Sequence, residues 1–151
     1  MTFVAIAAVA GGVFYFKTVS VLEMKNMDHP RVVPIRITPS ERFSVFYVHS
    51  IYQEPVIEEF QVEGDAILLK GVKTKSPAIM EYYGFEDTKE FHPMDVKLGA
   101  LFIIRRGMGE GQGVLIRDRK IYLSEVGERG DRIQLRVKSI PLGKYMIGML
   151  E

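Results

Sequence analysis

A histidine and two glutamates on neighbouring predicted strands have the residue types and the spacing best suited to chemistry. The segment Phe43–Val62, FSVFYVHSIYQEPVIEEFQV, reads as two strands of alternating apolar residues with a short turn near 52–55. With a two-residue tip His49 lies opposite Glu58, and a slip of one residue brings Glu59 there instead. A carboxylate bonded to one ring nitrogen favours a general base or a metal ligand. We favour a structural or ligand-orienting pair over both of these roles.

The residues around this pair do not complete a catalytic set. Ser50 follows His49 directly, so on a regular strand its side chain points to the opposite face and the imidazole cannot activate it. The other histidines, His29 and His92, are far apart in sequence and form no metal-ligand spacing; His92 is expected in a surface loop. The chain has no cysteine, which excludes disulfides and thiolate sites. We predict a protein that is not an enzyme and needs no metal or other cofactor.

A glycine-rich loop after a predicted strand is a second candidate site. Residues 107–113, GMGEGQG, precede Val-Leu-Ile instead of a helix and lack the Lys-Ser/Thr pair of a phosphate loop. A flexible hairpin loop is therefore favoured over a nucleotide site. Arg105 and Arg106, just before it, could bind a carboxylate ligand through their guanidinium forks, with solvated loop-edge charges as the ordinary alternative.

An aromatic cluster lies in the longest stretch without periodicity, residues 74–98. Tyr82, Tyr83 and Phe85 could stack on a ligand there, but anchoring the loop to the core is the commoner use of such residues, and we favour it. Residues 77–83 are expected to form one or two helical turns at most. A connection of this length inside a compact domain is usually functional or mobile.

The N-terminus carries the most apolar segment of the chain. Residues 1–22 are long enough to cross a bilayer, with Lys17 placed to reach the interface. We expect a membrane anchor there; a signal peptide and a buried strand or helix of a soluble domain are the alternatives. A linker at 23–30 and a β domain at 31–151 follow. Positive charges after the apolar run favour a cytoplasmic C-terminal side.

Composition and strand pattern give the fold class. The chain has 151 residues, of which 47% are hydrophobic and 26% charged, and a net charge of +1, so we expect one domain and no nucleic-acid partner. We predict an all-β protein, an antiparallel β-sandwich or small barrel of about seven to eight strands, preceded by the apolar helix. The predicted strands are 32–37 (an edge strand because of Pro34), 43–51, 56–62, 66–73 (with Glu58 facing Lys70), 100–105, 114–117, 120–126 and 132–140.

The hairpin has the sequence YVHSI at 47–51, PV at 55–56 and EEF at 58–60. This resembles the signature of the domain of unknown function 1850 family: an aromatic-x-His-Ser-aliphatic strand, a short turn, Pro-Val, and a glutamate before an aromatic residue. The resemblance covers roughly residues 33–140. Members commonly have an N-terminal apolar segment and are often encoded beside TRAP transporters of the TAXI type. The glycine-rich stretch that the family tends to show after the third strand is TKSPA here, at 74–78.

The resemblance implies a membrane-anchored, single-pass, extracytoplasmic domain that assists a TRAP-type solute uptake system without catalysing a reaction. This location conflicts with the cytoplasmic side that the positive charges after the apolar run favour. Its partner would be the membrane subunit or the solute-binding protein of that transporter. A small-ligand or metal-binding module centred on His49 and Glu58 is the alternative, and a hydrolase with His49 as base is a third, weaker one. The candidate ligand-binding residues are His49, Ser50, Glu58, Glu59, Arg105 and Arg106.

Overall fold

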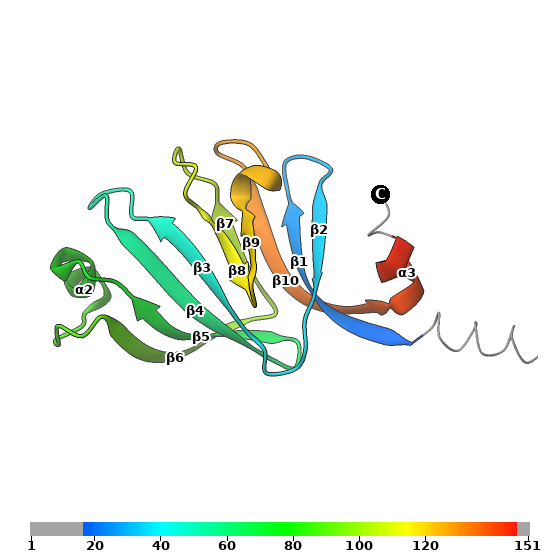
Figure 1. Cartoon of the computed structure of the whole chain (residues 1–151), viewed down its shortest axis with the longest axis horizontal. Coiled ribbons are helices and arrows are strands. Elements are labelled where there is room, and N and C mark those ends of the chain that lie inside the picture. Colours follow the sequence, from blue (N-terminus) through cyan, green and yellow to red (C-terminus); the bar gives the residue numbers. More distant parts are fainter. Residues whose placement is uncertain (1–16, 148–151) are drawn as a thin grey trace, which may run out of the picture.

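Two antiparallel sheets make up the protein, which confirms the predicted all-β class (Figure 1). The computed structural model describes residues 17–147. Its four-stranded sheet has the order β2 (Val32–Arg36), β1 (Thr18–Asn26), β10 (Arg132–Pro141), β7 (Leu101–Arg105). Its six-stranded sheet has the order β6 (Phe91–Gly99), β5 (Ala66–Lys73), β4 (Pro55–Glu63), β3 (Arg42–Val48), β8 (Gly113–Ile116), β9 (Arg119–Tyr122).

The short helices lie at the edges of this architecture. Helix α2 (Pro77–Tyr83) confirms the predicted helical turns and connects β5 to β6, and α3 (Leu142–Ile147) follows β10. A single 3-10 turn, η1 (Leu123–Glu125), occupies the second half of the strand expected at 120–126. The chain passes between the two sheets at several connections. At the one from β6 to β7, Gly99 adopts a φ of 96°, a conformation that favours glycine.

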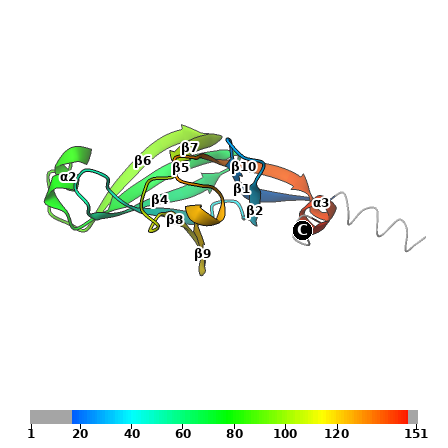
Figure 2. The same cartoon turned by 90° about the horizontal axis from the view of Figure 1, so that it is seen from above.

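The core lies between the sheets and receives side chains from both of them. Seen from above, the sheets lie between α2 at one end of the molecule and α3 at the other (Figure 2). Buried and less buried residues alternate along strands that face the core, as in β10, where Ile133, Leu135 and Val137 are buried and the residues between them are not. Phe60 of β4 sits at the centre, with ring centroids 5.2 Å from Phe43 and 5.0 Å from Phe102 of the other sheet. A smaller apolar cluster lies under α2 and comprises Val56, Val72 and Ile79.

Strand β1 changes the boundaries expected at the N-terminus. The predicted anchor, residues 1–22, lies mostly outside the described residues, but its last part from Thr18 belongs to β1, and so does the first half of the linker predicted at 23–30. β1 runs between β2 and β10, and four consecutive residues, 21–24, are buried. Glu23 among them forms an ion pair with Lys138 of β10. None of the helices described between residues 17 and 147 has the length and apolar character needed to cross a bilayer.

Polar contacts join the β1–β2 loop to the loop before β10. The buried Asn26 amide donates to Asp131 Oδ2 at 2.7 Å and to the Val126 carbonyl at 3.2 Å. Asp28 accepts hydrogen bonds from Arg132: 2.6 Å from Nη2 and 2.8 Å from the backbone N–H. These bonds hold the pKa of Asp28 at about 2, below its ordinary value of 3.8.

We expect the Asp28–Arg132 pair to make the protein acid-sensitive. Because the folded pKa is depressed, the unfolded chain binds more protons between about pH 4 and about pH 2, so the contribution of Asp28 to stability is present above this range and lost as the pH falls through it. In urea titrations at several pH values, Asp28→Asn should reduce the fall in the free energy of unfolding over that range. Asp65→Asn, in the β4–β5 turn, serves as the control, and an equal reduction there would contradict the assignment.

Candidate functional site

The candidate site is one end of the six-stranded sheet, which we call the distal end. It comprises the β3–β4 turn (residues 49–54), α2 with the following residues to Phe85, and the glycine-rich loop 107–112. The His49 ring of the turn lies 5.3 Å from the Tyr82 ring of α2. The turn and the glycine-rich loop line a common pocket. The distal end is opposite the point where β1 begins (Figure 1).

The β3–β4 turn is longer than the sequence indicates. Val48 pairs with Pro55, so six residues separate the strands instead of the predicted two. Two backbone bonds of 2.8 Å close the turn, from the His49 N–H to the Glu54 carbonyl and from the Gln53 N–H to the His49 carbonyl. Gln53 has a φ of 55°, a backbone angle that residues other than glycine rarely adopt. The predicted pairing of His49 with Glu58 is therefore wrong.

His49 organises the turn instead of facing a carboxylate. Its Nδ1 atom accepts a hydrogen bond of 3.3 Å from the Ile51 N–H. Its ring stacks on Tyr52, with the centroids 5.0 Å apart, and meets the edge of Tyr82 on α2. Within residues 17–147, no cluster of three or more acidic or histidine side chains is arranged to hold a metal ion.

Glu58 is the anchor of a small hydrogen-bond network that the sequence did not reveal. It faces Val45 on β3 and Val72 on β5, and not Lys70 as predicted. Its Oε1 atom accepts hydrogen bonds from the Tyr83 hydroxyl at 2.7 Å and the Tyr47 hydroxyl at 3.2 Å, and the two hydroxyl oxygens are 3.0 Å apart.

The tyrosine hydroxyls of this network remain protonated donors. Burial, followed by the nearby Glu58 charge, raises the pKa of Tyr47 above its usual value. Burial also raises the pKa of Tyr83, as do its hydrogen bonds with Tyr47 and Glu58. Glu58 lies two residues beyond the direct partner of Tyr47 on β4, a diagonal that long side chains can span. A correct register would therefore have predicted this contact.

Removing the Tyr83 hydroxyl should loosen α2 from the sheet. Tyr83→Phe deletes a hydrogen bond to a carboxylate, so we expect the free energy of unfolding to fall by about 1.5 kcal/mol. Tyr82→Phe is the matched control, since the adjacent hydroxyl has no hydrogen bond within the described residues, and its effect should stay within about 0.5 kcal/mol. Urea unfolding measures both values, and a loss of similar size in the two variants would show that the network does not hold the helix.

Aromatic rings continue from the network into the interior. The Tyr83 ring lies parallel to Phe85, with centroids 5.5 Å apart, and Phe85 stacks on His92 at 3.9 Å. His92 is buried, contrary to the prediction of a surface loop histidine, and its Nδ1 atom is 3.3 Å from Asp87 Oδ1. Tyr83 and Phe85 pack on the cluster under α2, which confirms the predicted anchoring role for these two residues. Tyr82 differs, because 63% of its surface is exposed.

A pocket of about 530 Å³ separates the β3–β4 turn from the glycine-rich loop. Ser50 and Gln53 line one side and Met108 lines the other. The Gln112 side-chain carbonyl accepts a hydrogen bond of 2.6 Å from the Gly107 N–H, which closes the base of the loop. The loop joins two strands, as the sequence predicted.

Three predicted site residues lie elsewhere or are already paired. Glu59 is opposite Ser44 and, as the neighbour of Glu58 on a strand, points to the other face. The buried Arg106 donates a 2.8 Å hydrogen bond to Glu110. Arg105 is exposed at the end of β7. Of the six candidates, the structure thus brings His49 and Ser50 together on the turn, with Glu58 beneath α2.

The distal end offers an exposed apolar surface on a fixed frame. Ile51 and Met108 are about three quarters exposed, and Tyr52 and Tyr82 are also exposed. The Tyr83–Glu58 hydrogen bond holds the helix that carries Tyr82, so Tyr82 is presented on a fixed element. Comparisons of the chain with protein-family models, curated proteins and solved structures found no match.

Proposed function

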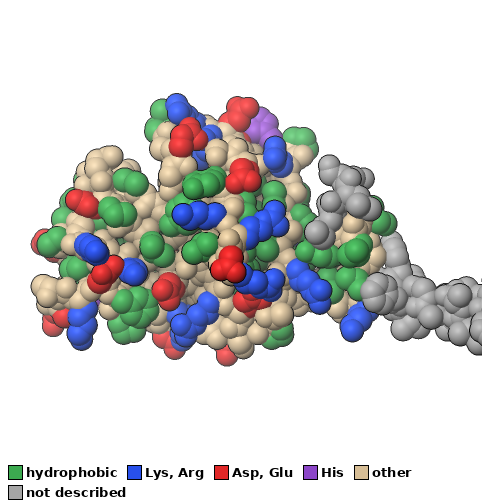
Figure 3. Space-filling view, viewed as in Figure 1, with side chains coloured by type: hydrophobic (Ala, Val, Ile, Leu, Met, Phe, Trp, Pro, Cys, Tyr) green, Lys and Arg blue, Asp and Glu red, His purple; other side chains and the backbone are tan. Residues whose placement is uncertain are grey.

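We propose that this protein is a non-enzymatic binding domain that contacts a partner protein through its distal end. The observation that carries the proposal is the group of exposed apolar side chains there, Ile51, Tyr52, Tyr82 and Met108, contributed by three separate chain segments, with the exposed Val48 at the adjoining end of β3. Apolar side chains are visible on this end of the space-filling view (Figure 3). Contiguous exposed apolar surface commonly marks an interaction site.

The residue types favour a protein as the partner. Tyrosine supplies a large contact area with few rotatable bonds, and methionine adapts to irregular surfaces, so both are enriched at protein interfaces. Tyr82 is carried by α2 beside Tyr83, which is bonded to Glu58, while Met108 lies on the glycine-rich loop. An exposed tyrosine on a fixed helix suits a folded partner.

We infer that the partner belongs to a TRAP-type solute uptake system, as the membrane subunit or the solute-binding protein. This part of the proposal rests on the resemblance of the hairpin to the domain of unknown function 1850 family, which remains a prediction. A domain held at a cell membrane by the segment before β1 would present the distal end away from the bilayer, an orientation that favours the solute-binding protein over the membrane subunit (Figure 1).

The alternative, a ligand or metal module centred on His49 and Glu58, has less support. His49 is occupied with the backbone and rings of its own turn, and Glu58 is occupied with two tyrosines. A hydrolase with His49 as its base is weakened in the same way, because no carboxylate orients that imidazole within the described residues.

The test is an affinity purification of the full-length, membrane-extracted protein, with bound proteins identified by mass spectrometry. We expect transporter subunits with the wild type and with Ile103→Ser, an exposed isoleucine on β7, and their loss with Ile51→Ser and with Tyr82→Ser. Absence of transporter subunits from the wild-type sample would refute the inferred partner. Equal recovery from all variants would refute the distal end as the contact surface.

A further inference from the structure

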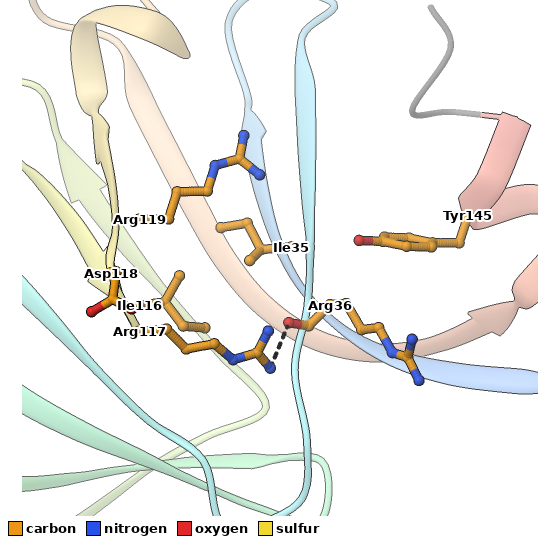
Figure 4. A pocket seen from close by; sticks show the side chains of 7 residues that line it. All are labelled: Ile35, Arg36, Ile116, Arg117, Asp118, Arg119 and Tyr145. Carbon is orange, nitrogen blue, oxygen red and sulfur yellow. Dashed lines mark hydrogen bonds between the residues drawn. The ribbon is translucent and has the colours of Figure 1, made fainter.

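The two sheets leave an open seam between their edge strands β2 and β9. A pocket of about 410 Å³ lies in this seam (Figure 4) and shares no lining residue with the pocket at the distal end. Its wall is formed by β2, by the two-residue turn between β8 and β9, and by α3. The side chains that matter for its chemistry are Ile35, Arg36, Arg117, Asp118, Arg119 and Tyr145.

Arg117 fixes the geometry of the seam. It has a φ of 52° in a turn where glycine is usual, a conformation that is unfavourable for an arginine. Its guanidinium forms a fork with Glu41, with Nε 2.6 Å from Oε1 and Nη2 2.7 Å from Oε2. The same Nη2 lies 3.5 Å from the Arg36 carbonyl of β2. These contacts keep the turn, and with it Arg119, in place beside β2.

The pocket has positive charge that the described residues do not neutralise. Arg119 has no carboxylate at ion-pair distance within residues 17–147, whereas Arg117 is paired with Glu41 and the Arg36 side chain is directed away from Arg119 (Figure 4). Asp118 also borders the pocket, but Figure 4 shows its carboxylate directed away from the guanidinium of Arg119. The space-filling view shows several Lys and Arg side chains on this face, over β8, β9 and β2 (Figure 3).

The remaining wall suits an organic body attached to an anionic group. Arg119 reaches toward β2 from one side and the Tyr145 hydroxyl from the other, with the apolar Ile35 between them (Figure 4). A guanidinium offers parallel N–H donors that match two oxygens of a carboxylate or a phosphate. A tyrosine hydroxyl adds a neutral donor beside them.

We propose that this seam pocket binds a small organic anion, with its carboxylate or phosphate group on Arg119 and Tyr145 and its apolar part on Ile35. Arg117 holds the wall through Glu41 and the Arg36 carbonyl. The site is separate from the distal end and does not depend on the function proposed for it.

Titration of the full chain, followed by amide chemical shifts in NMR spectra, tests the site. Benzoate probes for a carboxylate with an apolar body, and inorganic phosphate probes for a phosphate group. We expect shifts confined to β2, the β8–β9 turn and α3. Arg119→Gln should weaken binding about tenfold, since it removes a hydrogen-bonded charge, and Tyr145→Phe should weaken it less. Arg136→Gln, which removes an exposed charge on β10, should bind like the wild type.

Saturation by benzoate alone or by phosphate alone identifies the preferred anionic group and supports the site in either case. Absence of localised shifts with both probes would overturn the proposal. Equal weakening by Arg119→Gln and Arg136→Gln would also overturn it, because it would show a response to net charge instead of a site. Thermal unfolding of each variant verifies that these substitutions leave the fold intact.

Discussion

Replacing Phe60 by alanine should lower the free energy of unfolding by about 3–5 kcal/mol, the usual loss for truncating a buried phenylalanine. Phe60 is 1% exposed and stacks between Phe43 of β3 and Phe102 of β7. Because Phe43 and Phe102 belong to different sheets, the cavity would open at the place where the sheets meet. Neighbouring strands cannot close it without moving one sheet toward the other.

Urea unfolding followed by circular dichroism gives the value directly. Phe60→Leu keeps most of the volume and should lose less than Phe60→Ala. Tyr82→Ala, at a residue that is mostly exposed, should cost under about 1 kcal/mol. If the midpoint urea concentration for unfolding of Phe60→Ala equalled that of the wild type, the core between the sheets would not be packed as described.

Gly113→Ala should lower the free energy of unfolding by about 1–3 kcal/mol through overpacking. A methyl group on Gly113 would lie 2.6 Å from the Ile121 carbonyl oxygen and 2.5 Å from Cζ of Phe46. The oxygen belongs to the backbone of the paired strand β9, so relief requires the two strands to separate.

Gly109→Ala is the matched control for that substitution. It lies in the glycine-rich loop that leads into β8, and a methyl group there meets no atom within 4 Å. Its stability should be unchanged or slightly higher, since alanine restricts the unfolded chain. Thermal and urea unfolding should therefore show a loss of stability for Gly113→Ala and none for Gly109→Ala. Equal losses of stability in the two variants would contradict the predicted clash between β8 and β9.

Most of the strands that sequence reasoning located have one more deeply buried face. β10 is the clearest example, because its buried residues alternate with less buried ones from Arg132 to Lys138; the predicted alternation fails beyond that point, where Ser139 is exposed. Pro34 marked β2 as an edge strand, and β2 is indeed at the edge of its sheet. The first pattern follows from the two-residue period of a strand, and the second from the missing N–H of proline.

Two strands were missed because that period is hidden. β1 buries four residues in succession, so TVSVLEMKN reads as the end of an apolar run followed by a connector. β6 has the opposite problem: most of its residues are exposed, and Pro93 interrupts it, so Phe91–Gly99 resembles a loop. Adding these two strands to the eight predicted gives the ten observed.

The contacts of the candidate site could not be read from the sequence. The His49 ring meets Tyr82 at one end of the sheet and faces no carboxylate within the described residues, because its partner depended on the length of a turn. The turn contains no glycine that would have indicated its position in the sequence. Its positive φ is adopted by Gln53 instead. With six residues in the turn, Glu58 lies far enough along β4 to reach Tyr47 and Tyr83 instead.

The pairing of β1 with β10 sets the order in which the chain can fold during synthesis. Their register runs from Thr18 with Pro141 to Asn26 with Ile133. β1 therefore cannot complete this pairing until β10 has left the ribosome. β1 and β2 can form a hairpin early, and every strand of the six-stranded sheet is synthesised before β10. A chain that ended before Arg132 would keep all six of those strands but would leave β1 and β7 without the neighbour that joins them.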